Sequence, residues 1–193
     1  PEATYRDLWA TITAGGVWSG ELQNRRKDGT LFWEYEVIAP IKDEHDRTIN
    51  YVAIKQDITA FKDAQQELSR LAYEDQLTGL PSRNGFIRRL QQWADRVGWQ
   101  PSAAVVMVDI IGLRDLNDAY GYEGGDQLLV DFGRRLGEEA IEPDLAGRIG
   151  GDEFTLLLLP DADEMLEVRL GRLFESLSAP FELEGVAIEM AFR

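Results

Sequence analysis

The chain contains no cysteine and only one histidine, His45, among its 193 residues. The missing cysteines exclude disulfide bonds, thiol nucleophiles and cysteine-ligated metals, and a single histidine excludes a zinc site built on several imidazoles. Long hydrophobic runs are also missing: no stretch approaches the about 18 apolar residues of a membrane span, and none resembles a signal peptide. We therefore expect a cytoplasmic protein without a membrane segment of its own. Because the sequence begins at Pro1, we treat it as part of a longer chain, and whether that chain has a membrane anchor stays open.

Basic residues are scarce: the chain has 20 lysines and arginines but 35 aspartates and glutamates, which gives a net charge of −15. This balance argues against nucleic acid as a partner, because phosphate binding requires a basic face. An acidic protein can still bind a nucleotide when divalent cations mediate the contact. The remaining composition, 44% hydrophobic and 28% charged, is ordinary for a folded protein of one or two domains.

The N-terminal part is predicted to form antiparallel strands. Apolar and mostly polar residues alternate over 31–39, which predicts a half-buried strand, and 17–26 and 48–57 read as further strands. We expect the tryptophans of this sheet on one face, covering a core. Only a short helix over 2–15 precedes the sheet.

At Thr59 the hydrophobic period changes to that of an amphipathic helix, with Thr59 as its N-cap. The apolar positions of this helix are Phe61, Ala64, Leu68 and Leu71. Two interpretations stay open: the apolar stripe forms the seam of a parallel coiled-coil dimer, or it packs on its own domain.

The rest of the chain alternates helices and strands, which predicts an α/β layer with a mixed sheet. The apolar run 102–108 is expected as a central strand covered on both faces. The helix before it is predicted to bury Phe86, Ile87, Leu90, Trp93, Ala94 and Val97. The later elements are expected as helices over 113–121 and 124–140, strands over 145–149 and 154–159, a helix over 163–177 and a last strand over 186–192.

Three carboxylates are expected at one edge of this sheet. Asp109 ends the central strand, and Asp152 and Glu153 follow Gly150-Gly151, a pair that predicts a tight hairpin turn. Asp109 alone could simply cap the next helix. Converging carboxylates repel one another unless their pKa values rise or a cation binds, and a hard ion such as Mg²⁺ suits oxygen ligands. Since glycine lets a backbone approach phosphate closely, the residues suggest metal-dependent nucleotidyl or phosphoryl transfer.

Three blocks, RIGGDEF (148–154), DQLTGLPSRNGF (75–86) and VDIIGLRDLNDAYGYEGGDQLL (108–129), stand in the order of three motifs of one family. Together they resemble a GGDEF domain, the fold of diguanylate cyclases. The stretch 24–59, which ends in Asp-Ile-Thr, resembles the C-terminal half of a PAS (PAS/PAC) sensory domain.

The resemblance implies a domain order and a fold. A partial PAS domain with an antiparallel sheet is expected over 1–58, and a signalling helix over 59–74. A GGDEF domain, incomplete at its C-terminus, is expected over 75–193. Its fold would be the α/β palm of nucleotidyl cyclases, similar to ferredoxin-like folds, with a central mixed sheet flanked by helices.

The resemblance also implies the metal and catalytic residues. Asp109, the backbone carbonyl of Ile110, and Asp152 would ligate Mg²⁺ or Mn²⁺, and Glu153 would be a further ligand or activate the 3′-hydroxyl. Asp152, Glu153 and Arg114 are the catalytic candidates, with Arg114 standing where the family has a lysine. The cations would neutralise the triphosphate and lower the pKa of the attacking hydroxyl.

The nucleotide and partners follow from the same resemblance. Asn117 and Asp126 match the guanine-reading positions, and Gly150 and Gly151 would let the hairpin lie against the phosphates. Without the resemblance, Asn117 and Asp126 would read as ordinary helix-end residues. Two GTP-loaded domains would meet as a homodimer, through their GGDEF faces and the signalling helix, and condense GTP to cyclic di-GMP. The ligand of the PAS part is not identifiable.

Departures from the family keep two functions open. Ile111 stands in place of the second aspartate of the family's D-x-D pattern, Tyr122 replaces a histidine, and Ile141 replaces the arginine of the Arg-x-x-Asp inhibitory site. Near the end, EMAFR stands where the family has a Ser-Ile-Gly step. The chain is then either a diguanylate cyclase under PAS control, or a GTP-binding module that regulates a downstream EAL phosphodiesterase domain.

Overall fold

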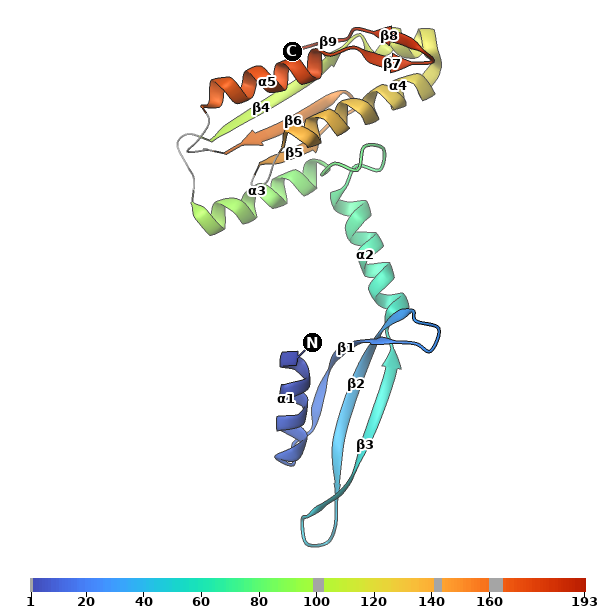
Figure 1. Ribbon diagram of the computed structural model, residues 1–193, viewed down its shortest axis with the longest axis vertical. Helices are drawn as coiled ribbons and strands as arrows, with labels where there is room; N and C mark the ends of the chain where they lie inside the picture. Colours follow the sequence, from blue (N-terminus) through green and yellow to red (C-terminus); the bar gives the residue numbers. More distant parts are fainter. Residues whose placement is uncertain (1, 99–102, 141–143, 160–164) are drawn as a thin grey trace. The chain divides into compact units, whose positions relative to one another are not determined.

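The computed structural model describes residues 2–98, 103–140, 144–159 and 165–193 (Figure 1). The chain divides into two compact units, Pro1–Leu68 and Ser69–Arg193. Among the helices within the described ranges, none is both long enough and apolar enough to cross a membrane.

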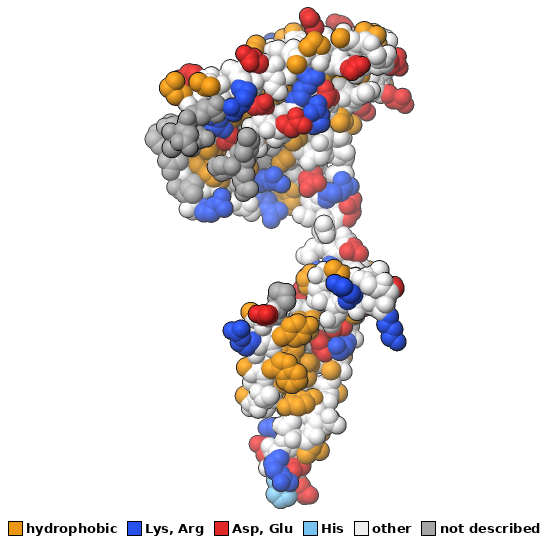
Figure 2. Space-filling model, in the orientation of Figure 1, with side chains coloured by type: hydrophobic (Ala, Val, Ile, Leu, Met, Phe, Trp, Pro, Cys, Tyr) orange, Lys and Arg blue, Asp and Glu red, His pale blue; other side chains and the backbone are white. Residues whose placement is uncertain are grey.

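The N-terminal unit is a three-stranded antiparallel sheet with one helix against it. Helix α1 (Glu2–Thr13) precedes strands β1 (Trp18–Arg25), β2 (Leu31–Lys42) and β3 (Thr48–Asp57), which pair in the order β1-β2-β3. A small core forms where Leu8 and Ile12 of α1 meet Trp18 and Leu22 of β1. Figure 2 shows hydrophobic side chains gathered on the visible face of this unit.

The prediction that the odd-numbered, apolar residues of β2 face the core is wrong. Pairing places Glu34 opposite Leu22 and Ile38 opposite Trp18, so the even-numbered residues of β2 share the face that α1 covers. Glu34 is only 4% exposed, whereas Tyr35 is 40% exposed. Trp18 and Trp33 consequently lie on opposite faces of the sheet rather than on one.

A shared cation explains how two carboxylates stay on the covered face. The ammonium of Lys55 lies 3.1 Å from a carboxylate oxygen of Glu34 and 3.1 Å from one of Glu36. The hydrogen bond to Glu36 is the main cause of a raised pKa of Lys55, which keeps the ammonium charged. Asn24 donates a further hydrogen bond to Glu34.

Helix α2 (Thr59–Tyr73) begins beside a group of hydrogen bonds at the end of β3, which connects Asp57, Thr59 and the backbone of Trp33. Asp57, rather than the predicted Thr59, supplies the accepting side chain: its Oδ1 accepts from Thr59 N at 2.9 Å and from Thr59 Oγ1 at 2.6 Å. Thr59 Oγ1 in turn accepts from Trp33 N at 3.0 Å. The two hydrogen bonds from Thr59, and then the one from Arg26, lower the pKa of Asp57 to about 2. The helix buries none of its residues, so its apolar stripe remains uncovered, with Leu68 67% exposed.

The C-terminal unit is built on a sheet of order β5-β6-β4-β9. In chain order its elements are α3 (Arg83–Val97), β4 (Ala104–Ile111), α4 (Leu113–Glu139), β5 (Leu145–Arg148), β6 (Glu153–Leu158), α5 (Leu166–Ser178), β7 (Phe181–Leu183), β8 (Val186–Ile188) and β9 (Ala191–Phe192). The expected α/β fold is confirmed. The sheet is not mixed, contrary to what was expected: within the described residues every pair of neighbouring strands is antiparallel, since β6 lies between β4 and β5, which run the same way, and β9 is antiparallel to β4. Parallel pairing is confined to an isolated bridge between Ser82 and Arg148.

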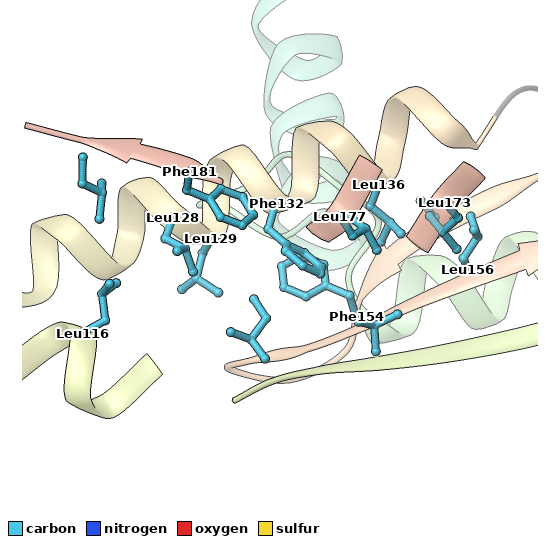
Figure 3. Close-up of a cluster of buried hydrophobic side chains, with 14 of the residues drawn as sticks. Leu116, Leu128, Leu129, Phe132, Leu136, Phe154, Leu156, Leu173, Leu177 and Phe181 are labelled. Atoms are coloured by element: carbon cyan, nitrogen blue, oxygen red, sulfur yellow. The ribbon is translucent and has the colours of Figure 1, made fainter. Parts of the chain in front are cut away.

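The main core of this unit lies between one sheet face and the helices α4 and α5. Phe132 of α4 packs on Phe154 of β6, with ring centroids 4.9 Å apart, and Phe181 joins the cluster (Figure 3). The buried members are Val108, Ile110, Leu116, Leu128, Leu129, Phe132, Leu136, Ala146, Phe154, Leu156, Leu158, Leu173, Leu177, Phe181 and Leu183. On the other face, α3 buries Phe86 and Trp93 against Leu157 and Leu159.

Several sequence expectations in this unit need correction or completion. Strand β4 is not covered on both faces, since Val105 is 56% and Met107 is 62% exposed. Ile87, predicted to be buried, is 43% exposed, and the side chain of Val97 lies outside the described residues.

The expected last strand is divided: β8 forms a hairpin with β7, and β9 pairs with β4. The division falls at Glu189 and Met190, which belong to neither strand, whereas the turn that joins β7 to β8 is made by Glu184 and Gly185, both with positive φ. The two helices expected over 113–121 and 124–140 are confirmed: the label α4 covers two helical segments that meet at Gly121, whose backbone is not helical (φ 75°, ψ 173°).

Candidate functional site

The hairpin between β5 and β6 carries the GGDEF residues. Its loop, residues 149–152, is closed by Ile149 N and Gly150 N, which donate to Glu153 O at 2.9 and 3.2 Å. The hairpin predicted at the glycine pair exists, and neither glycine has a positive φ. A Cβ on Gly150 would lie 2.6 Å from Oε2 of Glu153, whereas one on Gly151 would meet nothing within 4 Å. Gly150 thus makes room for Glu153, and Gly151 leaves the surface open.

The sheet register brings the predicted acidic residues to one edge. Asp109 on β4 lies directly opposite Glu153 on β6, and Ile110 N donates to Asp152 O at 3.1 Å. In an antiparallel strand the N–H and C=O of one residue point to the same side, so the Ile110 carbonyl also faces the hairpin. Nevertheless, within the described ranges no three acidic or histidine side chains approach closely enough to form a metal cluster.

Asp109 has a cationic partner that the sequence did not reveal. Strand β9 continues its pairing through Arg193, whose N and O exchange hydrogen bonds with Asp109 at 3.0 and 2.9 Å. Arg193 Nε and Nη2 both contact Oδ2 of Asp109, at 2.9 and 2.8 Å.

A cleft of about 650 Å³ opens between the start of α4 and the hairpin. It is lined by Leu113, Arg114, Asn117, Asp118, Tyr122, Leu129, Arg148, Gly151 and Asp152. Helix α4 begins after Gly112, which has a left-handed conformation (φ 87°) and offers no side-chain cap. The N–H groups of the first turn therefore depend on water or a ligand, and the helix dipole favours an anion there.

Asn117 carries a buried polar atom without a partner. Its Oδ1 is fully buried and receives no hydrogen bond from the residues that the structure describes. Gly125 from the next turns of α4 lies beside it, and a Cβ there would approach Oδ1 to 1.9 Å. Since buried oxygens are nearly always hydrogen-bonded, this atom indicates a donor supplied from outside the chain.

Arg148 fixes the base of the cleft. Its Nη1 donates to Asp75 Oδ1 at 2.9 Å and its Nη2 to Gly151 O at 2.6 Å. Burial alone would raise the pKa of Asp75, but hydrogen bonds from Thr78 and Arg148 outweigh this effect and hold the pKa below its usual value. The sequence blocks contain both residues, yet no role was assigned to either of them.

The predicted site residues separate into two groups. Arg114, Asn117, Gly151 and Asp152 line the cleft. Asp109, Ile110, Gly150 and Glu153 lie beside it on the strands and hairpin, and Asp126 is an exposed residue of α4 outside the cleft lining.

Comparison with known proteins assigns both units. Residues 72–192 match the family model described as diguanylate cyclase, GGDEF domain, and residues 1–60 match a PAS domain. The chain is 34% identical over 124 residues to the diguanylate cyclase TpbB of Pseudomonas aeruginosa, covering 63% of this chain and 28% of that protein. It is 35% identical over 127 residues to the cyclic di-GMP phosphodiesterase PdeR of Escherichia coli, covering 66% of this chain and 19% of that protein.

Among solved structures, a sensory box/GGDEF family protein from Caulobacter crescentus is similar with a TM-score of 0.56. The identity is 37%, and the match covers 63% of this chain and 80% of that one. Three of the curated relatives are much longer than this chain, which spans 20 to 28% of their length. With its family motifs assembled around one cleft, the chain belongs to the GGDEF family of diguanylate cyclase domains, here preceded by a PAS domain.

Proposed function

We propose that the protein is a diguanylate cyclase that condenses two GTP molecules to cyclic di-GMP and pyrophosphate under control of its PAS domain. The observation that carries this proposal is the buried, unpartnered Oδ1 of Asn117 in a cleft bounded by the hairpin and the start of α4. Guanine offers N1–H and N2–H donors, which suit an amide oxygen. The uncapped first turn of α4 suits phosphate oxygens.

The residues beside the cleft suit a hard divalent cation. The GGDEF family generally uses such a metal, and carboxylate and carbonyl oxygens are its preferred ligands. Asp109, the Ile110 carbonyl, Asp152 and Glu153 would hold Mg²⁺ or Mn²⁺. When bound, the ion neutralises phosphate charge and lowers the pKa of the attacking hydroxyl. Arg114 at the cleft wall would add positive charge near the triphosphate, and Glu153 would accept the proton of the 3′-hydroxyl.

Product formation requires two copies of the domain, since each GTP attacks the other. We propose that the copies pair through their GGDEF faces and through α2, whose exposed apolar stripe includes Phe61, Leu68 and Leu71. The hydrogen bonds among Asp57, Thr59 and Trp33 connect the first turn of this helix to the PAS sheet. A conformational change in the sheet would therefore act on the helix directly.

The proposal is tested by incubating the chain with GTP and Mg²⁺ and separating the nucleotides by chromatography. We expect cyclic di-GMP from the unaltered chain and none from the Asp152→Ala, Glu153→Ala double variant. GTP binding without product, weakened by Asn117→Ala, would instead support the second function.

That second function is a GTP-binding module which forms little product and regulates an EAL phosphodiesterase domain elsewhere in a longer chain. It is favoured by Ile111, an exposed apolar residue where the family has the second aspartate of its D-x-D pattern, and by the ion pair of Asp109 with Arg193. A longer chain that contains both domains would then show phosphodiesterase activity stimulated by GTP, and Asn117→Ala would abolish the stimulation.

A further inference from the structure

Arg193 occupies a position from which it affects the acidic edge directly. Asp109 on β4 lies between two partners. Glu153 of β6 is opposite it on one side, and Arg193, just after β9, is opposite it on the other. Directly opposed residues project from the same sheet face, so the three side chains form one row across three strands. Two like charges side by side are unfavourable, and the third member of the row compensates one of them.

We propose that Arg193 is the resident counter-ion of Asp109 and lowers the affinity of this edge for divalent metal. The inference rests on the proposed function, because it assumes that Asp109 is a metal ligand. The backbone pairing of Arg193 with Asp109 fixes where the guanidinium can reach. Both of its contacting nitrogens go to Oδ2, so a metal ion must either displace the guanidinium or bind through Oδ1 beside a positive charge.

The size of the effect is limited by solvent. The side chain of Arg193 is 79% exposed and that of Asp109 is 32% exposed, so water and salt screen the repulsion. We expect removal of the charge to tighten metal binding by about three- to tenfold at low ionic strength. The gain should shrink as salt is added, which a purely structural role of Arg193 would not produce.

The test is a titration of the chain with Mn²⁺ alone, with free Mn²⁺ followed by electron paramagnetic resonance. Arg193→Gln removes the charge and keeps the backbone pairing, whereas Arg193→Lys keeps the charge. Arg134→Gln is the matched control, because it removes one exposed, ion-paired arginine from α4, away from the cleft. Asp109→Asn reports whether the bound Mn²⁺ uses the proposed site, and circular dichroism verifies that each variant is folded.

Tighter binding by Arg193→Gln, with Arg193→Lys and Arg134→Gln close to the unaltered chain, would support the inference. Unchanged or weaker binding by Arg193→Gln, while Asp109→Asn loses Mn²⁺, would overturn it and leave the metal site of the proposed function standing. If Asp109→Asn binds Mn²⁺ as well as the unaltered chain, the proposed metal site itself is wrong and the inference falls with it.

Discussion

Arg148 joins Asp75, just after helix α2, to the carbonyl of Gly151 in the GGDEF hairpin, using two different nitrogens of one guanidinium. A planar fork with several donors is required for this double contact, which a lysine ammonium cannot reproduce in the same geometry. These two hydrogen bonds therefore connect the N-terminal start of the GGDEF domain to the hairpin that lines its cleft.

Arg148→Lys should lower the free energy of unfolding by about 1–2 kcal/mol, because the side chains are mostly buried and one hydrogen bond is lost. Urea denaturation measures the loss. Arg134→Lys is the control, since its ion pairs with Asp131 and Glu138 are exposed and should change stability by less than about 0.5 kcal/mol. Equal losses in the two variants would contradict the role given to Arg148.

Gly125→Ala should weaken GTP binding more than it weakens the fold. The new Cβ would collide with the amide of Asn117, which is the movable end of a side chain and can swing away. We expect at least a tenfold rise in the dissociation constant for GTP, about 1.4 kcal/mol, measured by calorimetry. Gly171→Ala meets nothing within 4 Å and serves as control. Unchanged affinity in Gly125→Ala would separate Asn117 from nucleotide binding.

The buried ion pair of Arg169 and Asp144 should dominate the stability of the far end of the sheet. Arg169 also donates to Leu159 O at 2.6 Å, and Asp144 accepts from Leu159 N at 2.9 Å. Arg169→Met leaves a buried carboxylate unpaired and should cost about 3–5 kcal/mol. The double variant with Asp144→Leu should recover most of this loss in the same denaturation assay; a double variant as unstable as the single one would refute the explanation.

Added cyclic di-GMP should not slow product formation. Asp144 is the last residue of the segment that matches the inhibitory motif, and it is 6% exposed and already paired with Arg169. The other residues of that segment, 141–143, lie outside the described residues, and Ile141 cannot bind a phosphate. Initial rates measured with increasing product should stay constant, and a saturable decrease would show a feedback site elsewhere on the chain.

Acid should destabilise the PAS unit partly through Asp57. Its folded pKa of about 2 lies below its ordinary value of 3.8, so its contribution is fully present above that value and is lost as the pH falls towards 2. Asp57→Asn should therefore lower the unfolding temperature at pH 6 and have little effect near pH 2. A difference between the two proteins that does not depend on pH would exclude the carboxylate charge as the cause.

The sequence predicted the positions of helices and strands better than it predicted which of their faces are buried. Alternation over 31–39 identified β2, yet it could not show that Lys55, on the next strand, neutralises Glu34 and Glu36 and so allows their side to be covered. The division of the last strand was missed because the pattern of 186–192 gives no signal at Glu189 and Met190, where β8 has ended and β9 has not begun.

For the site, the chemistry of carboxylates and glycines indicated Asp109 and the hairpin, whereas Asn117 was indicated only by the resemblance to the family. Arg193 could not be predicted, since its role arises from the register between β9 and β4 rather than from any local pattern. Arg148 belongs to the RIGGDEF block, but its contact with Asp75 depends on tertiary packing across the unit.

The pairing of β9 with β4 also has a consequence for how the domain is made. Arg193 and Asp109 are 84 residues apart in sequence, so this edge of the sheet closes only after a long loop has been formed. Loop closure of this kind carries an entropic cost and slows folding. Until residues 191–193 leave the ribosome, the edge of β4 is open to pairing with other chains, and aggregation during synthesis should be the characteristic failure of this domain.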